Sequence, residues 1–243
     1  MTNKIKTTIM PLGDLHVGAK TFNRDLFEQW LKDAKNYCKH GKRKGKGYIL
    51  LNGDLCDFAR ATQDAWSSTM TATEQIDFVV EALEPFQDNI IGSTISNHSS
   101  RAYREFNLDV GQEISNRLDI PYSIDLFHDV EYSKSNYKRI FARHGTRFSK
   151  SYLLFMRNFI ADMNNIEADV FIQGHSHFLG SQTRIVRTAD GVKKKHYVVN
   201  GAFIDYMGSY AQKSGYDMRL AGYPIISFDA DGEFNCVEKW ADI

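Results

Sequence analysis

The stretch Tyr48-Ile49-Leu50-Leu51-Asn52-Gly53-Asp54-Leu55-Cys56-Asp57 organises the interpretation of the whole chain. Its apolar run ends abruptly at Asn-Gly, which is typical of a buried strand that runs into a turn. The turn displays two carboxylates, Asp54 and Asp57, three positions apart. Taken alone, Gly-Asp-x-x-Asp is more typical of carboxylates that only cap the next segment, so a functional meaning depends on the rest of the chain.

Four further segments combine an apolar run with Asp, Asn or His at its end. They are Asp14-Leu15-His16, Asn97-His98, His144-Gly145 and Gly174-His175-Ser176-His177. Imidazole, carboxylate and amide oxygen together form a ligand set suited to manganese, iron or zinc. If the first segment is extended, Asp14 and His16 point the same way, because side-chain direction repeats every second residue. A pair of divalent cations sharing Asp54 would explain why such segments recur in one chain.

Length and composition limit the possible classes of protein. The chain of 243 residues fits one large α/β domain, residues 1–243, better than two small ones. Lys plus Arg equals Asp plus Glu at 30 each, so net charge does not steer the whole molecule toward nucleic acid or membrane. Three cysteines, Cys38, Cys56 and Cys236, argue against a disulfide framework and for a reducing compartment. Without a signal-like or membrane-spanning stretch, we expect a soluble cytoplasmic protein.

Strands and helices are predicted to alternate along most of the chain. Strands are expected at 7–12, 48–51, 89–96, 137–142 and 169–173, and helices after Asn23, after the capping box of Thr71 and Glu74, at 106–118 and at 152–163. The last quarter is expected to be antiparallel, with hairpin turns at Ala189-Asp190-Gly191 and Asp231-Gly232. Candidate ligands follow the strands, and the carboxyl ends of strands form the binding crevice of open α/β sheets.

Together the five segments resemble the calcineurin-like metallophosphoesterase superfamily, including its small stand-alone members of the DNA-repair exonuclease and bacteriophage type. Their order and spacing match over residues 14–177, about two thirds of the chain. The resemblance implies two packed mixed β-sheets flanked by helices, the four-layer αββα arrangement of an α/β protein.

The resemblance also implies a role for each motif residue. One metal would be held by Asp14, His16, Asp54 and His177, and a second by Asp54, Asn97, His144 and His175, with Asp54 as the bridge. His98 would lie over the scissile phosphate, with Asp57 orienting its ring. Two positions depart from the family pattern: Ser96 replaces the usual Gly, and Ser99 the usual Asp or Glu.

The chemistry of these residue types favours an enzyme that hydrolyses phosphoric esters. Two divalent cations lower the pKa of a bridging water, so that the resulting hydroxide attacks phosphorus in line, and they clamp the phosphoryl oxygens. His98 would act as general acid, and Arg101 would neutralise a non-bridging oxygen. We expect Mn²⁺, with Zn²⁺, Fe and Mg²⁺ as alternatives. The histidines outside every motif are taken as structural: His40, His128 and His196.

For the substrate, the leading hypothesis is a phosphodiester of nucleic acid. Five cations flank the motif loops: Arg101, Arg104, Arg143, Arg147 and Lys150. The loop between Gly201 and Gly222 offers aromatic and basic side chains either for base stacking or for its own packing: Phe203, Tyr206, Tyr210, Lys213 and Tyr216. A basic loop at 39–46 is either a solvated turn or a phosphate contact.

Two other functions stay open at this point. One is a small-molecule phosphatase or cyclic-nucleotide phosphodiesterase; the other is a metal-stabilised binding module without turnover, suggested by Ser96 and Ser99. The sequence indicates no membrane partner and does not decide the oligomeric state.

Overall fold

Two mixed β-sheets form the centre of a computed structural model that describes residues 7–39, 46–58, 68–146, 149–189, 191–209, 212 and 218–241. The six-stranded sheet has the order β11-β10-β1-β2-β3-β4. Its strands are β1 (Thr7–Leu12), β2 (Lys46–Leu51), β3 (Ile90–Thr94), β4 (Tyr122–Ser123), β10 (Gly222–Phe228) and β11 (Phe234–Trp240). The five-stranded sheet has the order β5-β6-β7-β9-β8. Its strands are β5 (Leu126–Ser133), β6 (Asn136–Arg143), β7 (Val170–Gln173), β8 (Leu179–Thr188) and β9 (Gly191–Asn200).

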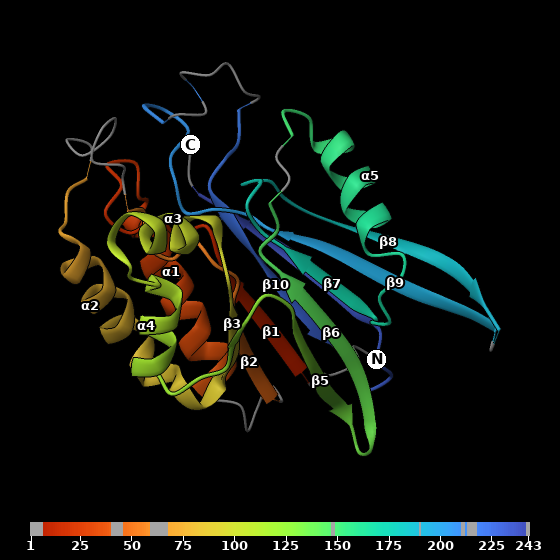
Figure 1. Ribbon diagram of the computed structural model, residues 1–243. Helices are drawn as coiled ribbons and strands as arrows, with labels where there is room; N and C mark the ends of the chain where they lie inside the picture. Colours follow the sequence, from red (N-terminus) through yellow and green to blue (C-terminus); the bar gives the residue numbers. More distant parts are fainter. Residues whose placement is uncertain are drawn as a thin grey trace.

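Helices cover the outer face of each sheet, so the four-layer prediction is confirmed (Figure 1). Four helices lie on the side of the six-stranded sheet: α1 (Arg24–Ala34), α2 (Ala72–Leu83), α3 (Asn97–Phe106) and α4 (Val110–Arg117). Helix α5 (Tyr152–Asp162) lies on the five-stranded sheet. Two short helical turns extend the pattern: η1 (Lys35–Lys39) continues α1, and η3 (Glu84–Asn89) continues α2.

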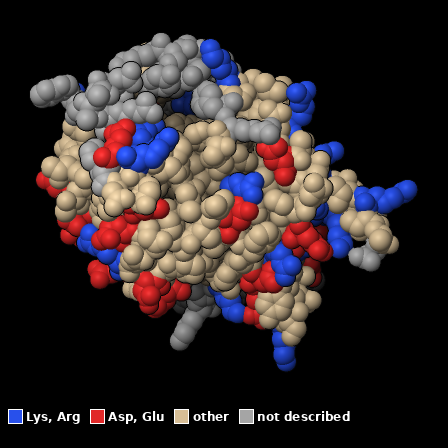
Figure 2. All heavy atoms as spheres, viewed as in Figure 1, with Lys and Arg blue, Asp and Glu red and all other residues tan. Residues whose placement is uncertain are grey.

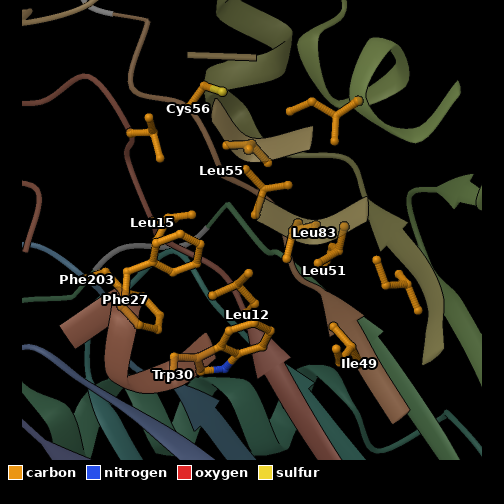
Figure 3. Packing of buried hydrophobic residues seen from close by; sticks show 14 of the residues in the cluster. Leu12, Leu15, Phe27, Trp30, Ile49, Leu51, Leu55, Cys56, Leu83 and Phe203 are labelled. Atoms are coloured by element: carbon orange, nitrogen blue, oxygen red, sulfur yellow. The ribbon is translucent and has the colours of Figure 1, made fainter. Parts of the chain in front are cut away.

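Three apolar layers hold these elements together. Trp30 and Phe27 of α1 are fully buried against β1 and β2 (Figure 3). Between the sheets, Ile9 packs with Val198 and their neighbours, and under α5 Phe159 meets Tyr197 edge to face. Burying one such side chain contributes about 1.5–3 kcal/mol, so these layers fix how the strand ends meet.

Parallel pairing brings the candidate ligands to one edge. Strands β1, β2, β3 and β4 pair in parallel in one sheet, and β6, β7 and β9 do so in the other. The helix expected after Asn23 is confirmed as α1, and the Asn23 side chain caps it by accepting a hydrogen bond from the Leu26 N–H at 2.8 Å. The predicted capping box at Thr71 and Glu74 is also present.

Three features of the secondary structure differ from the prediction. The helix expected at 106–118 is present but begins later, as α4 at Val110, because Asn107 takes a left-handed conformation (φ 54°) that ends α3, and Asp109 then caps α4. Helix α3 itself was not expected; the Ser96 side chain caps it. The stretch after Pro121, expected to be irregular, contains β5, which pairs along β6. Alternation of polarity is weak in β5 because the apolar Phe127 lies on its exposed face, whereas the polar His128 lies on the face of the buried Leu126 and Val130.

A candidate metal centre at the joint edge of the sheets

Asp14, His16 and His177 form the first group of potential ligands, called here the Asp14 triad. Their ligand atoms lie within 4.8 Å of one another. His177 Nε2 lies 3.3 Å from Asp14 Oδ1 and 3.2 Å from His16 Nε2. Asp14 is fully buried, and the loops after β1 and β7 therefore converge on one enclosed carboxylate.

Asp54, His144 and His175 form the second group, the Asp54 triad, which satisfies the same 4.8 Å criterion. His144 Nε2 lies 3.1 Å from Asp54 Oδ2 and 3.0 Å from Asn97 Oδ1. The other ring nitrogen of His144 donates to the main-chain carbonyl of Asn52 at 2.7 Å, which aims Nε2 at the carboxylate. The amide oxygen of Asn97 therefore lies beside this group, which the resemblance implied it would join as a ligand.

Asp54 lies between the two triads. The same Oδ2 that faces His144 is 4.0 Å from His16 Nε2 in the Asp14 triad. The Asp54 side chain is almost fully buried, and its Oδ1 accepts a hydrogen bond from the His98 N–H at 3.1 Å. This geometry suits the bridging position that the resemblance implied.

Five of these residues adopt the left-handed backbone conformation. They are Asp14 (φ 51°), His16 (φ 50°), Asp54 (φ 47°), His175 (φ 66°) and His177 (φ 58°). The expectation of an extended Asp14-x-His16 segment is therefore wrong, although both side chains still reach the same group. Each such conformation costs about 1–3 kcal/mol outside glycine, and strain of this kind gathers at functional sites.

Asp57 serves two histidines through different atoms. The ring of His98 donates from Nδ1 to the main-chain carbonyl of Asp57, while the Asp57 carboxylate lies 3.4 Å from His16 Nδ1. His98 Nε2 faces the centre, 3.9 Å from Asp54 Oδ2. The side chain of Asp57 therefore orients a residue of the Asp14 triad, and its backbone orients His98. Arg101 lies one turn further along α3.

Burial and charge give these groups unusual acidity. Burial alone would raise the pKa of Asp14, but the hydrogen bond and charge of His177 lower it to about 2. Burial would lower the pKa of His144, but the charge of Asp54 and its hydrogen bond raise it to about 9. Burial lowers the pKa of His98 to about 4 and also lowers that of His175. Without metal, the centre therefore holds anionic carboxylates and a protonated His144 at neutral pH.

The donor set fits divalent cations. Two buried carboxylates need cations beside them, because an uncompensated buried charge is costly. The ring nitrogens of His16 and His177 face each other at 3.2 Å, an approach that a shared cation accommodates. Oxygen and imidazole donors in two adjoining groups match borderline-hard metals such as Mn²⁺ or Zn²⁺. Several Asp and His groups of this edge are therefore suited to hold metal ions.

A chain of buried amides behind the ligands was not found from the sequence. Thr94 Oγ1 donates to Asn52 Oδ1 at 2.9 Å, Asn52 Nδ2 donates to Asn200 Oδ1 at 2.7 Å, and Asn200 Nδ2 donates to Asp14 Oδ2 at 3.1 Å. Since the Asn52 carbonyl also receives the His144 ring, the chain supports both triads. A signal existed: Asn200-Gly201 follows an apolar strand just as Asn52-Gly53 does.

Replacing Asn200 by Ala is expected to weaken metal binding by about 10- to 100-fold, because Asp14 loses the amide that orients it. It should also destabilise the protein by about 1–3 kcal/mol, since the Asn52 amide is left unpaired. Metal titration and thermal unfolding measure the two effects. Asn116→Ala on the exposed face of α4 is the matched control. Equal metal affinity in both variants would refute a positioning role for Asn200.

Metal binding is expected to release a proton near neutral pH. His144 is protonated below about pH 9 in the metal-free protein, and a histidine must be neutral to coordinate. Metal affinity should therefore rise with pH, by about tenfold per unit for one proton, and level off above about pH 9. Calorimetric titration in two buffers of different ionisation enthalpy counts the protons; identical heats would contradict the expectation.

Several predicted substrate contacts have another role in the structure. Arg143 forms a two-point ion pair with Asp125, at 2.5 and 2.7 Å, so it is not a free phosphate contact. Phe203 is fully buried and stacked on Tyr223, so its ring is not available to a base. His196, stacked on Phe234, and His128, beside Tyr48, are structural as expected.

Some predicted positions lie outside the described residues. These are His40 and most of the basic loop at 39–46, Arg147, Tyr210, Lys213 and Tyr216. The described helices include none long and apolar enough to cross a lipid bilayer.

The architecture and the site together define the structural class. Two packed mixed sheets, flanked by helices, carry Asp-x-His, Gly-Asp-x-x-Asp, Asn-His, His and Gly-His-x-His in that order at one edge. The two packed sheets and this order of potential ligands are what the resemblance to the calcineurin-like metallophosphoesterases implied.

No protein-family model matches the chain, and no curated protein matches it by sequence. Similar solved structures include a single mutant of Vps29 from Entamoeba histolytica, with 14% identity, 97% of this chain and 99% of that chain covered, and a TM-score of 0.48. A predicted phosphoesterase from Streptococcus pneumoniae has 13% identity, 99% coverage of both chains and a TM-score of 0.37. A putative 5'-nucleotidase from Staphylococcus aureus has 9% identity and a TM-score of 0.47, covering 96% of this chain and 53% of that one.

Proposed function

We propose that the protein is a phosphodiesterase that uses two divalent metal ions to hydrolyse nucleic acid. Mn²⁺ is the metal that we propose first. The observation that carries the proposal is the position of Asp54, whose one carboxylate oxygen lies 3.1 Å from His144 and 4.0 Å from His16. One residue thereby joins two ligand groups, as a dinuclear site requires. When bound, the cations would activate water and neutralise charge on the phosphoryl oxygens.

His98 is the candidate general acid. Its Nδ1–H is fixed on the Asp57 carbonyl, so Nε2 faces the centre, where a leaving oxygen can receive a proton. Burial lowers the pKa of His98 to about 4, so the ring is neutral without substrate. An anionic phosphodiester beside the ring would raise this pKa and favour the protonated form. Arg101 supplies further positive charge near Asp57 and His98.

The turn before His98 supports turnover rather than binding alone. Ser96 caps α3, and Ser99 Oγ accepts the Gly111 N–H at 3.2 Å, which ties α3 to α4. The two serines therefore hold the start of α3 in a defined place. His98 stays aligned by two contacts, its N–H to Asp54 and its ring to Asp57.

Partial exposure along one side of the centre supports a polymer rather than an enclosed small molecule as the substrate. The side chains of Asp14 and His144 are wholly buried, whereas those of His177, Asp57 and His98 are 25%, 19% and 13% exposed. The cavity beside Asp54 and His98 has a volume of about 10 Å³, which is room for about one water molecule. A nucleotide base does not fit there, so substrate would approach across the open side.

The test is hydrolysis by metal-stripped protein resupplied with Mn²⁺, Zn²⁺ or Mg²⁺. The substrates are single-stranded and duplex DNA, RNA, bis(4-nitrophenyl) phosphate, 4-nitrophenyl phosphate and cyclic nucleotides. We expect cleavage of nucleic acid and of the aryl diester with Mn²⁺, and little with the monoester. Faster turnover of the monoester or of cyclic nucleotides would make the nucleic-acid assignment wrong. No hydrolysis with any metal would make the enzyme assignment wrong.

A further inference from the structure

The outer half of the β8–β9 hairpin projects from the body of the protein (Figure 1). The two strands pair from Leu179 and Asn200 out to Thr188 and Gly191, but β7 pairs with β9 only from His196 to Val199. Residues 184–188 and 191–195 therefore form a two-stranded ribbon beyond β7, called here the β8–β9 ribbon.

The ribbon carries a local excess of positive charge in a chain whose net charge is zero. Its cations are Arg184, Arg187, Lys193, Lys194 and Lys195. The register and the alternation of side chains place Arg184, Lys193 and Lys195 on one face, and Arg187 and Lys194 on the other. Figure 2 shows Lys and Arg atoms along this projecting part. All three lysines have interactions within the protein; Lys194 bonds Glu233, and Lys195 donates to the Ile166 carbonyl.

Exposed apolar side chains accompany these cations. Ile185 is 73% exposed and Val192 is 69% exposed, and both lie on the face of Arg187. Protection of an edge strand against aggregation explains charges but not exposed β-branched residues between them. Arg184 also stands directly opposite Lys195, and a like-charge pair across strands destabilises a hairpin. The combination therefore calls for a partner that is anionic and also offers apolar surface.

We propose that the β8–β9 ribbon docks into a groove of duplex nucleic acid. The major groove admits a two-stranded ribbon, and minor-groove proteins combine Arg or Lys with apolar wedges. Ile185 and Val192 lie against sugars and base edges, and Arg187 contacts a phosphate from the same face. Arg184, on the opposite face, reaches a flanking phosphate with its long side chain. The inference deepens the proposed function and rests on it for cleavage, although binding at the ribbon does not require catalysis.

The ribbon also sets a length for the substrate. Val192 lies eight positions before Asn200, which contacts Asp14 at the metal centre, so about 27 Å of strand separates tip and centre. At about 3.4 Å per base pair, one duplex reaches both only if it is longer than about eight base pairs. Shorter substrates should be hydrolysed without any contribution from the ribbon.

The experiment compares two double variants. The ribbon variant combines Arg184→Gln with Arg187→Gln. The control combines Lys32→Gln with Lys35→Gln, at exposed positions of α1 and η1. Binding of metal-free protein to a labelled duplex of about 30 base pairs is measured by anisotropy at several salt concentrations. We expect the ribbon variant to bind about tenfold more weakly, with the salt slope reduced by about two, and the control to match the wild type. With Mn²⁺, KM should rise for the long duplex and not for bis(4-nitrophenyl) phosphate.

A second variant tests the apolar contribution. Ile185→Ser combined with Val192→Ser should weaken duplex binding at an unchanged salt slope, since no phosphate contact is lost. Circular dichroism checks that both ribbon variants are folded.

Equal loss in the ribbon variant and the control would overturn the inference. So would a wild type that binds polyglutamate but not duplex, which would point to an acidic protein partner. Cleavage of duplex that does not depend on the ribbon would reject this inference and leave the proposed function intact. Ribbon-dependent binding of duplex without any cleavage would support this inference and reject the proposed function.

Discussion

Replacing Asp54 by Asn is expected to abolish hydrolysis, with a loss of at least about a thousandfold, or about 4 kcal/mol of transition-state stabilisation. The substitution keeps the shape of the side chain but removes the negative charge that faces His144 at 3.1 Å and His16 at 4.0 Å. Both ligand groups lose the anion that they share. Initial rates with bis(4-nitrophenyl) phosphate and metal content by mass spectrometry measure the effect.

The same substitution at Asp88, an exposed position of η3, is the matched control and should leave the rate and metal content unchanged. If Asp54→Asn retained two metals and more than about a tenth of the rate, Asp54 would not be the bridge.

Replacing His98 by Ala is expected to lower kcat by about 10²- to 10⁴-fold while metal content is retained. His98 belongs to neither triad, but its Nε2 faces the centre 3.9 Å from Asp54. The loss should depend on the leaving group: large for a nucleoside alkoxide, which needs a proton, and small for 4-nitrophenolate, which does not. Comparing rates for these two kinds of ester therefore isolates general acid catalysis from metal binding.

His128→Ala provides the control, because His128 is a histidine of β5 beside Tyr48 and away from the centre. A uniform loss with every leaving group, or loss of metal from His98→Ala, would mean that His98 holds the site together. The cluster of His16, Asp57 and His98 makes this a real alternative, since their ligand atoms also lie within 4.8 Å.

The convergence of the candidate ligands on one edge could be predicted from sequence, because these residues follow apolar strands and recur in a fixed order. Asp14, Asp54 and His144 each stand just beyond the end of a strand, and parallel pairing then brings them to one edge. The backbone conformation of these residues could not be predicted from the periodicity of the sequence. The left-handed conformations at Asp14 and His16 depend on hydrogen bonds to the neighbouring loop, from the Asp14 N–H to Gly53 and from the His16 N–H to Asp54.

Residues that act through tertiary contacts carried weaker signals. Arg219 is buried and donates to the carbonyls of Ser176 and Ser149, so it joins the loop of His177 to the segment after His144. No local pattern marks it. Likewise, the pairing of Arg143 with Asp125 follows from the position of β5, which the sequence did not reveal. The two contacts of Asp57, from its carboxylate to His16 and from its main-chain carbonyl to His98, are also visible only in the three-dimensional structure.

The most direct test of the proposed dinuclear centre is anomalous diffraction from a crystal of the protein soaked in Mn²⁺. We expect two peaks about 3.5–4 Å apart, one among Asp14, His16 and His177 and the other among Asp54, His144 and His175, with Asp54 touching both. A single peak, or one held by His16, Asp57 and His98 with none beside His144, would contradict it.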